Sequence, residues 1–182
     1  MTDAGLVLAA GEGRRFGGPK QLARLDGRPL VEHVLAAVSA VLDRVVVVLG
    51  ARAEEVRRGA DLAHAEVVVC PDWQHGLGAS VRCGLAALAG ADRVLVAVAD
   101  QPGLTPAAIR AVLAQPGSAR AVYHGRPGHP VVLGGELLAR AGDLRGDTGF
   151  RDLLSGVPEV ECGDLGDPMD IDTREDLEVV RE

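Results

Sequence analysis

Aromatic residues are scarce in this chain and make up only 2% of its 182 residues. A surface that stacks the bases of single-stranded nucleic acid needs several aromatic side chains, so their scarcity argues against nucleic-acid binding. The formal net charge of −7 argues the same way, because proteins that bind a polyphosphate backbone usually carry a clustered basic excess. We therefore expect no nucleic-acid partner, and any site for an anion must be local.

Cysteine is also rare. Cys70, Cys83 and Cys162 are odd in number and form no C-x-x-C pair, which indicates neither a disulfide framework nor a thiolate zinc site. We expect three buried thiols. No segment approaches the roughly 20 apolar residues of a membrane span, and no basic segment precedes the first apolar run. The expectation is a cytoplasmic protein that does not contact a membrane.

Hydrophobic residues, by contrast, make up 47% of the chain, enough for a substantial core of Ala, Val and Leu. Strands as continuously apolar as residues 45–49 are expected where both faces of a sheet are covered by helices. The fold is therefore predicted to be a three-layer α/β/α sandwich around a Rossmann-like, mostly parallel sheet. Short apolar runs that predict its strands lie at 5–10, 44–49, 65–70, 93–98 and 119–123.

Three helices have clear sequence signals. Apolar residues recur at helical spacing over 30–42, and Thr105 with Pro106 supplies an N-cap followed by a first-turn proline. Thr173 and Asp176 resemble a capping box, which predicts a last helix from Arg174. No linker or internal repeat is present, so residues 1–182 are expected to form a single domain. Its glycine-rich segment 124–167 is the expected acceptor-binding subregion.

The first predicted strand leads into a glycine-rich loop at 11–20. Backbone N–H groups of such a loop, beyond the carboxyl end of a strand, can approach phosphate oxygens closely. The loop is neither a dinucleotide fingerprint, which requires glycine where Phe16 stands, nor a P-loop, which requires Ser or Thr where Gln21 stands. Lys20 is the only lysine among 19 basic residues, which favours a phosphate contact over a chance surface position.

Acidic residues at two places could hold Mg²⁺. Asp100 follows the strand predicted at 93–98, at the same sheet edge as the loop, although a turn or helix N-cap would also use an Asp there. Asp170 and Asp172 alternate, so an extended segment would place both on one face. From spacing alone an exposed acidic turn is the competing interpretation for this second pair.

Residues 8–20, L-A-A-G-E-G-R-R-F-G-G-P-K, resemble the L-A-A-G-x-S-x-R-M-G-x-P-K signature of MobA-like nucleotidyltransferases, the molybdenum cofactor guanylyl- and cytidylyltransferases. The cytidylyltransferase branch is the most similar. Its D-Q-P, G-H-P-V, G-D-x-G-A-R and D-I-D-T blocks are matched, in order, by residues 100–102, 128–131, 146–151 and 170–173, with Phe150 in place of the alanine. The resemblance spans nearly the whole chain and implies a fold of the nucleotide-diphospho-sugar transferase type.

The resemblance implies a Mg²⁺-dependent transfer of a nucleoside monophosphate from a nucleoside triphosphate, CTP by preference, to a phosphorylated acceptor such as molybdopterin, with release of pyrophosphate. A molybdoenzyme would then receive the product. The catalytic residues would be Arg15, Lys20 and Asp100, and the metal ligands Asp100 and Asp172, with Asp170 as a further candidate. Acceptor-binding residues would be His129 and Asp147. The nucleotide-binding residues would be Leu8, Ala9, Ala10, Gly11, Glu12, Gly13, Lys20, Gly76, Ser80 and Asp100.

Departures from the signature leave open which nucleotide base, that of CTP, GTP or another triphosphate, is preferred. Gly13 replaces the loop serine, Phe16 replaces the methionine, and segment 74–80 keeps one serine of the G-L-S-S-S stretch. Two other functions remain as alternatives: a nucleotide-binding regulatory module without turnover, and a nicotinamide-dependent oxidoreductase of the kind that acts on nicotine-derived pigments. The regulatory module would be favoured if the metal aspartates were missing. The oxidoreductase would be favoured by the dinucleotide fingerprint, which Phe16 breaks.

Overall fold

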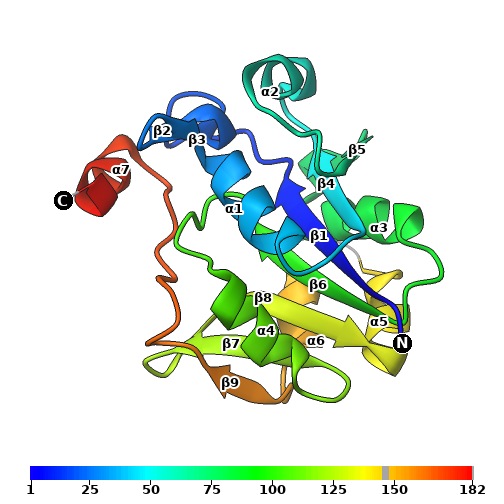
Figure 1. Ribbon diagram of the computed structural model, residues 1–182. Helices are drawn as coiled ribbons and strands as arrows, with labels where there is room; N and C mark the ends of the chain where they lie inside the picture. Colours follow the sequence, from blue (N-terminus) through cyan, green and yellow to red (C-terminus); the bar gives the residue numbers. More distant parts are fainter. Residues whose placement is uncertain (145–147, 182) are drawn as a thin grey trace.

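A computed structural model describes residues 1–144 and 148–181 of the chain. Its centre is a seven-stranded sheet that is parallel except for one strand, β8 (Figure 1). The prediction of a mostly parallel sheet is therefore confirmed. Across the sheet the strand order is β5 (Glu66–Val69), β4 (Val45–Leu49), β1 (Asp3–Ala9), β6 (Arg93–Val98), β8 (Arg126–Gly134), β7 (Ala119–Tyr123) and β9 (Glu159–Glu161).

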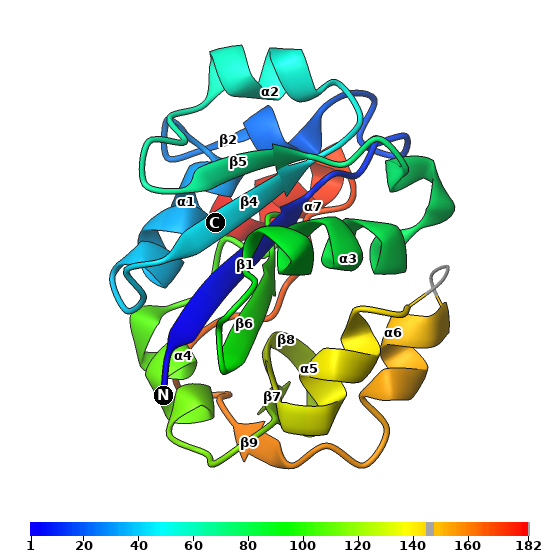
Figure 2. The ribbon, with the colours of Figure 1, turned by 90° about the vertical axis from the view of Figure 1, so that its right-hand side faces the viewer.

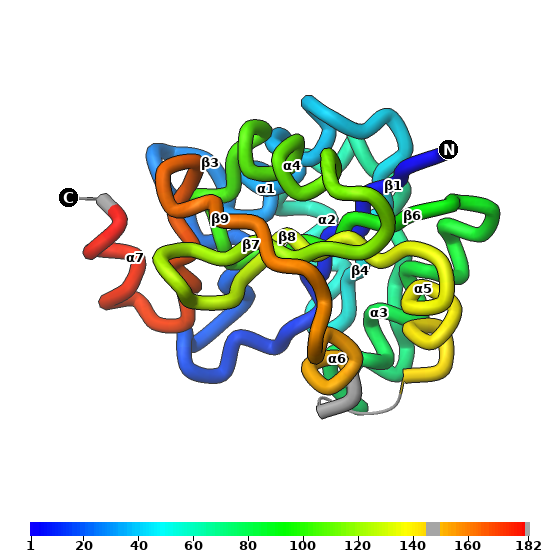
Figure 3. The backbone as a smooth tube through the Cα atoms, turned by 90° about the horizontal axis from the view of Figure 1, so that it is seen from below, coloured from blue at the N-terminus to red at the C-terminus, as the bar shows by residue number. Residues whose placement is uncertain are grey.

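Helices cover both faces of this sheet, as the views from the side and from below show (Figures 2 and 3). One face packs against α1 (Leu30–Ser39) and α4 (Pro106–Leu113), and Val56 of α2 (Ala53–Gly59) joins the same core. The other face packs against α3 (Leu77–Ala87), α5 (Gly135–Ala141) and α6 (Thr148–Leu153). The predicted three-layer sandwich is confirmed.

The two cores follow from the alternation of side chains along each strand. On β1, Val7 and Ala9 face α1, whereas Leu6 and Leu8 face α3. Because both sets are apolar and buried, β1 can only be a central strand. Helix α3 packs so closely on this strand that a Cβ added at Gly84 would lie 2.2 Å from Leu6 Cδ1.

Strand β8 is the longer of two strands of this sheet that the sequence pattern did not predict, the other being β9. Strand β8 runs antiparallel to both β6 and β7, and it begins in the Gly- and Pro-rich part of segment 124–167. Pro127 and Pro130 lack an amide N–H, and prolines usually argue against a central strand. Segment 124–167 therefore contains β8, α5, α6 and β9, more regular structure than its composition indicates.

The helix ends agree with their sequence signals, with one difference. Thr105 Oγ1 accepts a hydrogen bond from Ala108 N at 3.2 Å, and α7 (Arg174–Arg181) begins where predicted. Asp176 Oδ2 accepts from Thr173 N at 2.7 Å and Thr173 Oγ1 accepts from Asp176 N at 3.2 Å, so the capping box is real. Helix α1, however, ends at Ser39 rather than at residue 42.

The remaining elements are short. They are the 3₁₀ turns η1 (Lys20–Leu22) and η2 (Trp73–His75) and the hairpin strands β2 (Arg24–Leu25) and β3 (Arg28–Pro29). Helix α7 packs against this hairpin through a small separate cluster that includes Phe16, Leu25 and Leu177. A search of the described residues finds no helix with the length and apolar character of a membrane span.

Candidate active site

The site lies beyond the carboxyl ends of β1 and β6, which are neighbouring parallel strands. Their pairing continues past the strands, because Ala99 N donates to Leu8 O at 3.0 Å. Asp100 follows directly, beside the loop that leaves β1. The backbone of Ile171 is bound to it, since Ile171 N donates to Asp100 O at 2.9 Å. This bond brings Asp172, 72 positions further along the chain, to the same sheet edge.

Lys20 joins the two aspartates. Its Nζ donates to Asp100 Oδ2 at 2.5 Å and to Asp172 Oδ1 at 2.8 Å, and its side chain is only 16% exposed. Arg15 Nη2 donates to the other oxygen of Asp172 at 2.8 Å. Asp100 Oδ1 is buried and has no hydrogen-bond partner among the described residues. The structure thus gathers four residues that the resemblance implicates, and it leaves one carboxylate oxygen free to accept.

Burial and charge set the ionisation of this cluster. Burial lowers the pKa of Lys20, but the carboxylates of Asp100 and Asp172 outweigh it, so its pKa is raised above the usual value. The hydrogen bond from Lys20 lowers the pKa of Asp172. Lys20 is therefore an ammonium and Asp172 a carboxylate at neutral pH, so the two form an ion pair.

Asp170 has a different partner from Asp172. Gln101 Nε2 donates to Asp170 Oδ1 at 2.7 Å, and burial raises the pKa of this carboxyl group. Asp170 and Asp172 thus have different hydrogen-bond partners, Gln101 and Lys20, although both line the same cavity. Among the residues described, no group of three or more Asp, Glu, His or Cys side chains is arranged to hold a metal ion.

The loop after β1 is shaped by glycine and held by a glutamine. Gly13 has φ +69°, and a Cβ there would lie 2.0 Å from Gly18 O, so only glycine fits this turn. Gln21 is buried and its Nε2 donates to Ala9 O and Gly11 O, both at 2.8 Å. Gln21 was not predicted as a site residue, and its position directly after Lys20 is the one signal in the sequence that points to it.

A cavity of about 510 Å³ opens between this loop and the start of α3. Most of the residues expected to bind nucleotide line it, but Glu12 and Gly13 line a neighbouring cavity of about 430 Å³ instead. The larger cavity can take a nucleoside with its phosphates at the charged end. Its lining is Leu8, Ala9, Ala10, Gly11, Arg15, Lys20, Gln21, Gly76, Leu77, Ser80, Val98, Ala99 and Asp100.

A second cavity, of about 610 Å³, adjoins the first and contains Asp170, Asp172 and His129. The two cavities share four lining residues, Arg15, Leu77, Val98 and Asp100. Ligands bound in the two cavities would therefore meet at Arg15 and Asp100, beside the Lys20 ion pairs.

The wall of the second cavity is formed by β8 and α6. The His129 ring stacks against Phe150 with 6.5 Å between the ring centroids, and burial lowers the pKa of this histidine. His129 thus lines the expected acceptor region as a neutral ring. Arg120 and Arg151, which were not predicted as site residues, also line it. Asp147 lies outside the described residues.

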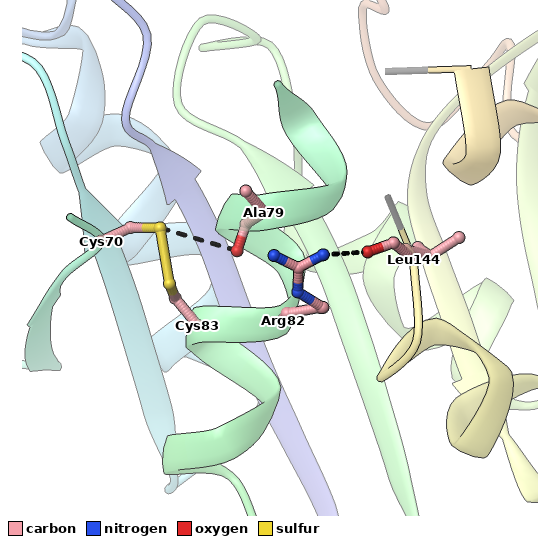
Figure 4. Close-up of a disulfide and its surroundings, with 5 residues drawn as sticks. All are labelled: Cys70, Ala79, Arg82, Cys83 and Leu144. Carbon is pink, nitrogen blue, oxygen red and sulfur yellow. Dashed lines mark hydrogen bonds between the residues drawn. A yellow bond between two sulfur atoms is a disulfide. The ribbon is translucent and has the colours of Figure 1, made fainter. Parts of the chain in front are cut away.

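Helix α3, which carries Ser80, is bonded to two neighbouring segments of the chain (Figure 4). Cys70, after β5, is bonded to Cys83 on α3, with 5.7 Å between their Cα atoms, while Arg82 Nη1 donates to Leu144 O. The expectation of three buried thiols was therefore wrong for this pair, because residues 13 apart in sequence come together only when α3 packs beside β5. Cys162 is a buried free thiol.

Reduction of this disulfide should destabilise the protein. Closing a loop of about 15 residues is worth roughly 3 kcal/mol in the chain-entropy description. We expect a lower Tm in the presence of a reductant, measured by circular dichroism, and one titratable thiol in the denatured oxidised protein against three after reduction. The Cys70→Ser/Cys83→Ser variant serves as the control, because its Tm should not respond to the reductant. An unchanged wild-type Tm would contradict the expectation.

Comparisons with known proteins agree with this geometry. The MobA-like NTP transferase domain family matches residues 5–161. The chain is 38% identical to the nicotine blue oxidoreductase of Paenarthrobacter nicotinovorans, over 95% of this chain and 93% of that protein. It is 47% identical to the 2-C-methyl-D-erythritol 4-phosphate cytidylyltransferase of Ralstonia nicotianae, over 57% of this chain and 46% of that one. The crystal structure of Rv0371c from Mycobacterium tuberculosis in complex with manganese has a TM-score of 0.83 and 28% identity, covering 99% of this chain and 98% of that one.

Proposed function

We propose that this chain, which belongs to the MobA-like NTP transferase family, transfers a nucleoside monophosphate from a nucleoside triphosphate, CTP by preference, to the phosphate of a small acceptor such as molybdopterin. Pyrophosphate is the second product. The observation that carries the proposal is the pair of adjoining cavities that share Arg15 and Asp100 beside Lys20. Transfer between two bound substrates needs two such compartments with charge where they meet.

The chain's own groups have separate tasks in this reaction. The glycine loop presents backbone N–H groups to the phosphates, held in place by the hydrogen bonds of Gln21. Arg15 and Lys20 are the cations that neutralise the triphosphate as the acceptor oxygen displaces pyrophosphate from the α-phosphorus. No protein nucleophile is needed, because the acceptor phosphate attacks directly and catalysis comes from positioning and charge.

The residues present fit a Mg²⁺ ion. Asp100 and Asp172 already converge on one cationic atom, and Asp100 Oδ1, buried without a partner among the described residues, is available as a further oxygen ligand from the same carboxylate. With only two carboxylates, the remaining ligands would come from phosphates and water, which is the usual arrangement for Mg²⁺. When bound, Mg²⁺ supplies charge neutralisation and polarisation of phosphate oxygens. The manganese complex of the Mycobacterium tuberculosis relative supports a divalent cation in this fold.

The choice of CTP rests on similarity alone. The Ralstonia relative is a cytidylyltransferase, and the D-Q-P block at Asp100 is that of the cytidylyltransferase branch. In this proposal the reaction takes place in the cytoplasm, and a molybdoenzyme receives the nucleotide-bearing cofactor.

The name of the Paenarthrobacter relative points to a second candidate, reduction of a pigment by a nicotinamide nucleotide. Its similarity over 95% of this chain is the observation in favour. Against it, Phe16 stands where the dinucleotide loop requires glycine, and the convergent charges of Lys20, Asp100 and Asp172 serve phosphate chemistry. A nucleotide-binding module without turnover is the third candidate function, and one experiment distinguishes all three.

The test is pyrophosphate release from CTP, GTP, ATP and UTP with Mg²⁺, with and without molybdopterin, alongside a parallel assay of NADPH oxidation with a nicotine-derived pigment. We expect release that depends on the acceptor and is fastest with CTP. Oxidation of NADPH without pyrophosphate release would replace the proposal with the oxidoreductase. Triphosphate binding without release from any of the four, and without NADPH oxidation, would indicate the regulatory module.

A further inference from the structure

The ammonium of Lys20 lies where a divalent cation bridging Asp100 and Asp172 would have to lie. It is within 2.5 Å of Asp100 Oδ2 and 2.8 Å of Asp172 Oδ1, so it touches both carboxylates at once. A Mg²⁺ ion bound by both would need its ligands at about 2.0–2.1 Å. An ammonium and a dication cannot occupy this space together, because they compete for the same oxygens and repel each other.

Lys20 cannot leave the aspartates unless another anion receives it. Its side chain is 16% exposed, so withdrawal into the cleft without an anionic partner would leave a poorly solvated charge. The nucleotide cavity, which Lys20 also lines, offers such a partner once a triphosphate is bound. Lysine suits an exchange of this kind, since its compact ammonium sits on a flexible stem, whereas the planar fork of arginine favours one fixed geometry.

We propose that Lys20 is an internal substitute for the metal ion: it neutralises Asp100 and Asp172 in the empty enzyme and moves to the triphosphate when the metal enters. The metal and the nucleotide then bind cooperatively, and the metal alone binds weakly. This inference rests on the proposed function for the identity of the anion, a triphosphate. It goes beyond that function by assigning Lys20 two successive partners and by fixing the order in which the site is filled.

The charges around Lys20 predict whether removal of its ammonium strengthens or weakens metal binding. Removing the ammonium leaves two carboxylates beside each other with Arg15 as the cation bound to one oxygen of Asp172. Their mutual repulsion, which Lys20 relieves in the wild-type protein, would then be relieved by a divalent cation instead. A variant without the ammonium should therefore bind the metal more tightly than the wild type when no nucleotide is present.

The experiment measures Mn²⁺ binding to the nucleotide-free protein by electron paramagnetic resonance. We expect Lys20→Met to bind Mn²⁺ about tenfold more tightly than the wild type, within the usual range of coupling between sites. Mn²⁺ should also raise the Tm of Lys20→Met and leave that of the wild type nearly unchanged. Lys20→Arg is the matched control, because it keeps a cation there and should bind Mn²⁺ weakly. The double variant Lys20→Met/Asp100→Asn should lose this gain in Mn²⁺ affinity.

Equal Mn²⁺ affinity of the wild type and Lys20→Met would overturn the inference, and so would tight binding by the double variant, which would place the metal elsewhere. A second measurement needs no variant: a non-hydrolysable triphosphate analogue should raise the affinity of the wild type for Mn²⁺ about tenfold or more. No rise would overturn the inference even if Lys20→Met failed to fold. Neither measurement uses turnover, so failure of the proposed reaction would show as absent pyrophosphate release with these binding results intact.

Discussion

Replacing Asp100 by Asn should lower the rate of pyrophosphate release by about 10²- to 10³-fold, the usual effect of removing one group that stabilises transition-state charge. Asn has the same shape as Asp, so the fold should be retained. It lacks the negative charge that pairs with Lys20 and that would hold Mg²⁺ between the two cavities. Asp172→Asn should have the same direction of effect, since its carboxylate contacts the same ammonium.

The matched control is Asp43→Asn. Asp43 is exposed in the turn before β4, outside both cavities, and its replacement should leave turnover unchanged. Circular dichroism should show equal helical content in the three variants. Wild-type rates in both Asp100→Asn and Asp172→Asn would remove these residues from the metal site.

Replacing Gly13 by Ala should weaken triphosphate binding by about tenfold or more. An L-residue at its φ of +69° costs roughly 1–2 kcal/mol, and the added Cβ would lie 2.0 Å from Gly18 O, so the loop has to shift. The cost falls on the loop that shapes the nucleotide cavity, and about 1.4 kcal/mol corresponds to tenfold in affinity. Isothermal titration with a non-hydrolysable triphosphate analogue measures the effect.

Gly90→Ala separates backbone strain from the close contact with Gly18. Gly90 also has a positive φ, +86°, but a Cβ there meets nothing within 4 Å, and the residue lies before β6, at the opposite end of the strand from Asp100. This variant should lose some stability and keep its triphosphate affinity. If Gly13→Ala bound the analogue as tightly as the wild type, the loop would not be the phosphate-binding element.

Gly13 is also a departure from the family signature. Its glycine replaces the serine of the resembled pattern, and in this structure a serine would meet the same carbonyl of Gly18. The departure is therefore coupled to the turn that Gly17 and Gly18 make, where both amides donate to Gly13 O. Glycine at position 13 therefore matches the conformation of this loop.

Local patterns determined most of the sheet. The apolar runs predicted β1, β4, β5, β6 and β7, and most clearly β4, whose five residues are all apolar and buried because both faces of this strand are covered. Strand β8 was missed because Pro127 and Pro130 look like breaks in a local pattern. Whether a strand can tolerate them depends on which neighbours need its N–H groups, and that is a property of the assembled sheet.

The features of the candidate site likewise divide into those that the sequence indicates and those that only the folded structure creates. The sequence by itself determined the glycine loop, the unique Lys20 and an Asp at the end of a buried strand, because each is a local choice of residue type at a strand end. Only the tertiary structure decided that Lys20 bridges Asp100 and Asp172, that Gln21 holds the loop and that Cys70 meets Cys83. Lys20 and Asp172 are 152 positions apart, and their contact depends on the pairing of Ile171 N with Asp100 O. Periodicity and spacing describe neighbours along the chain, whereas such contacts arise from the packing of whole elements.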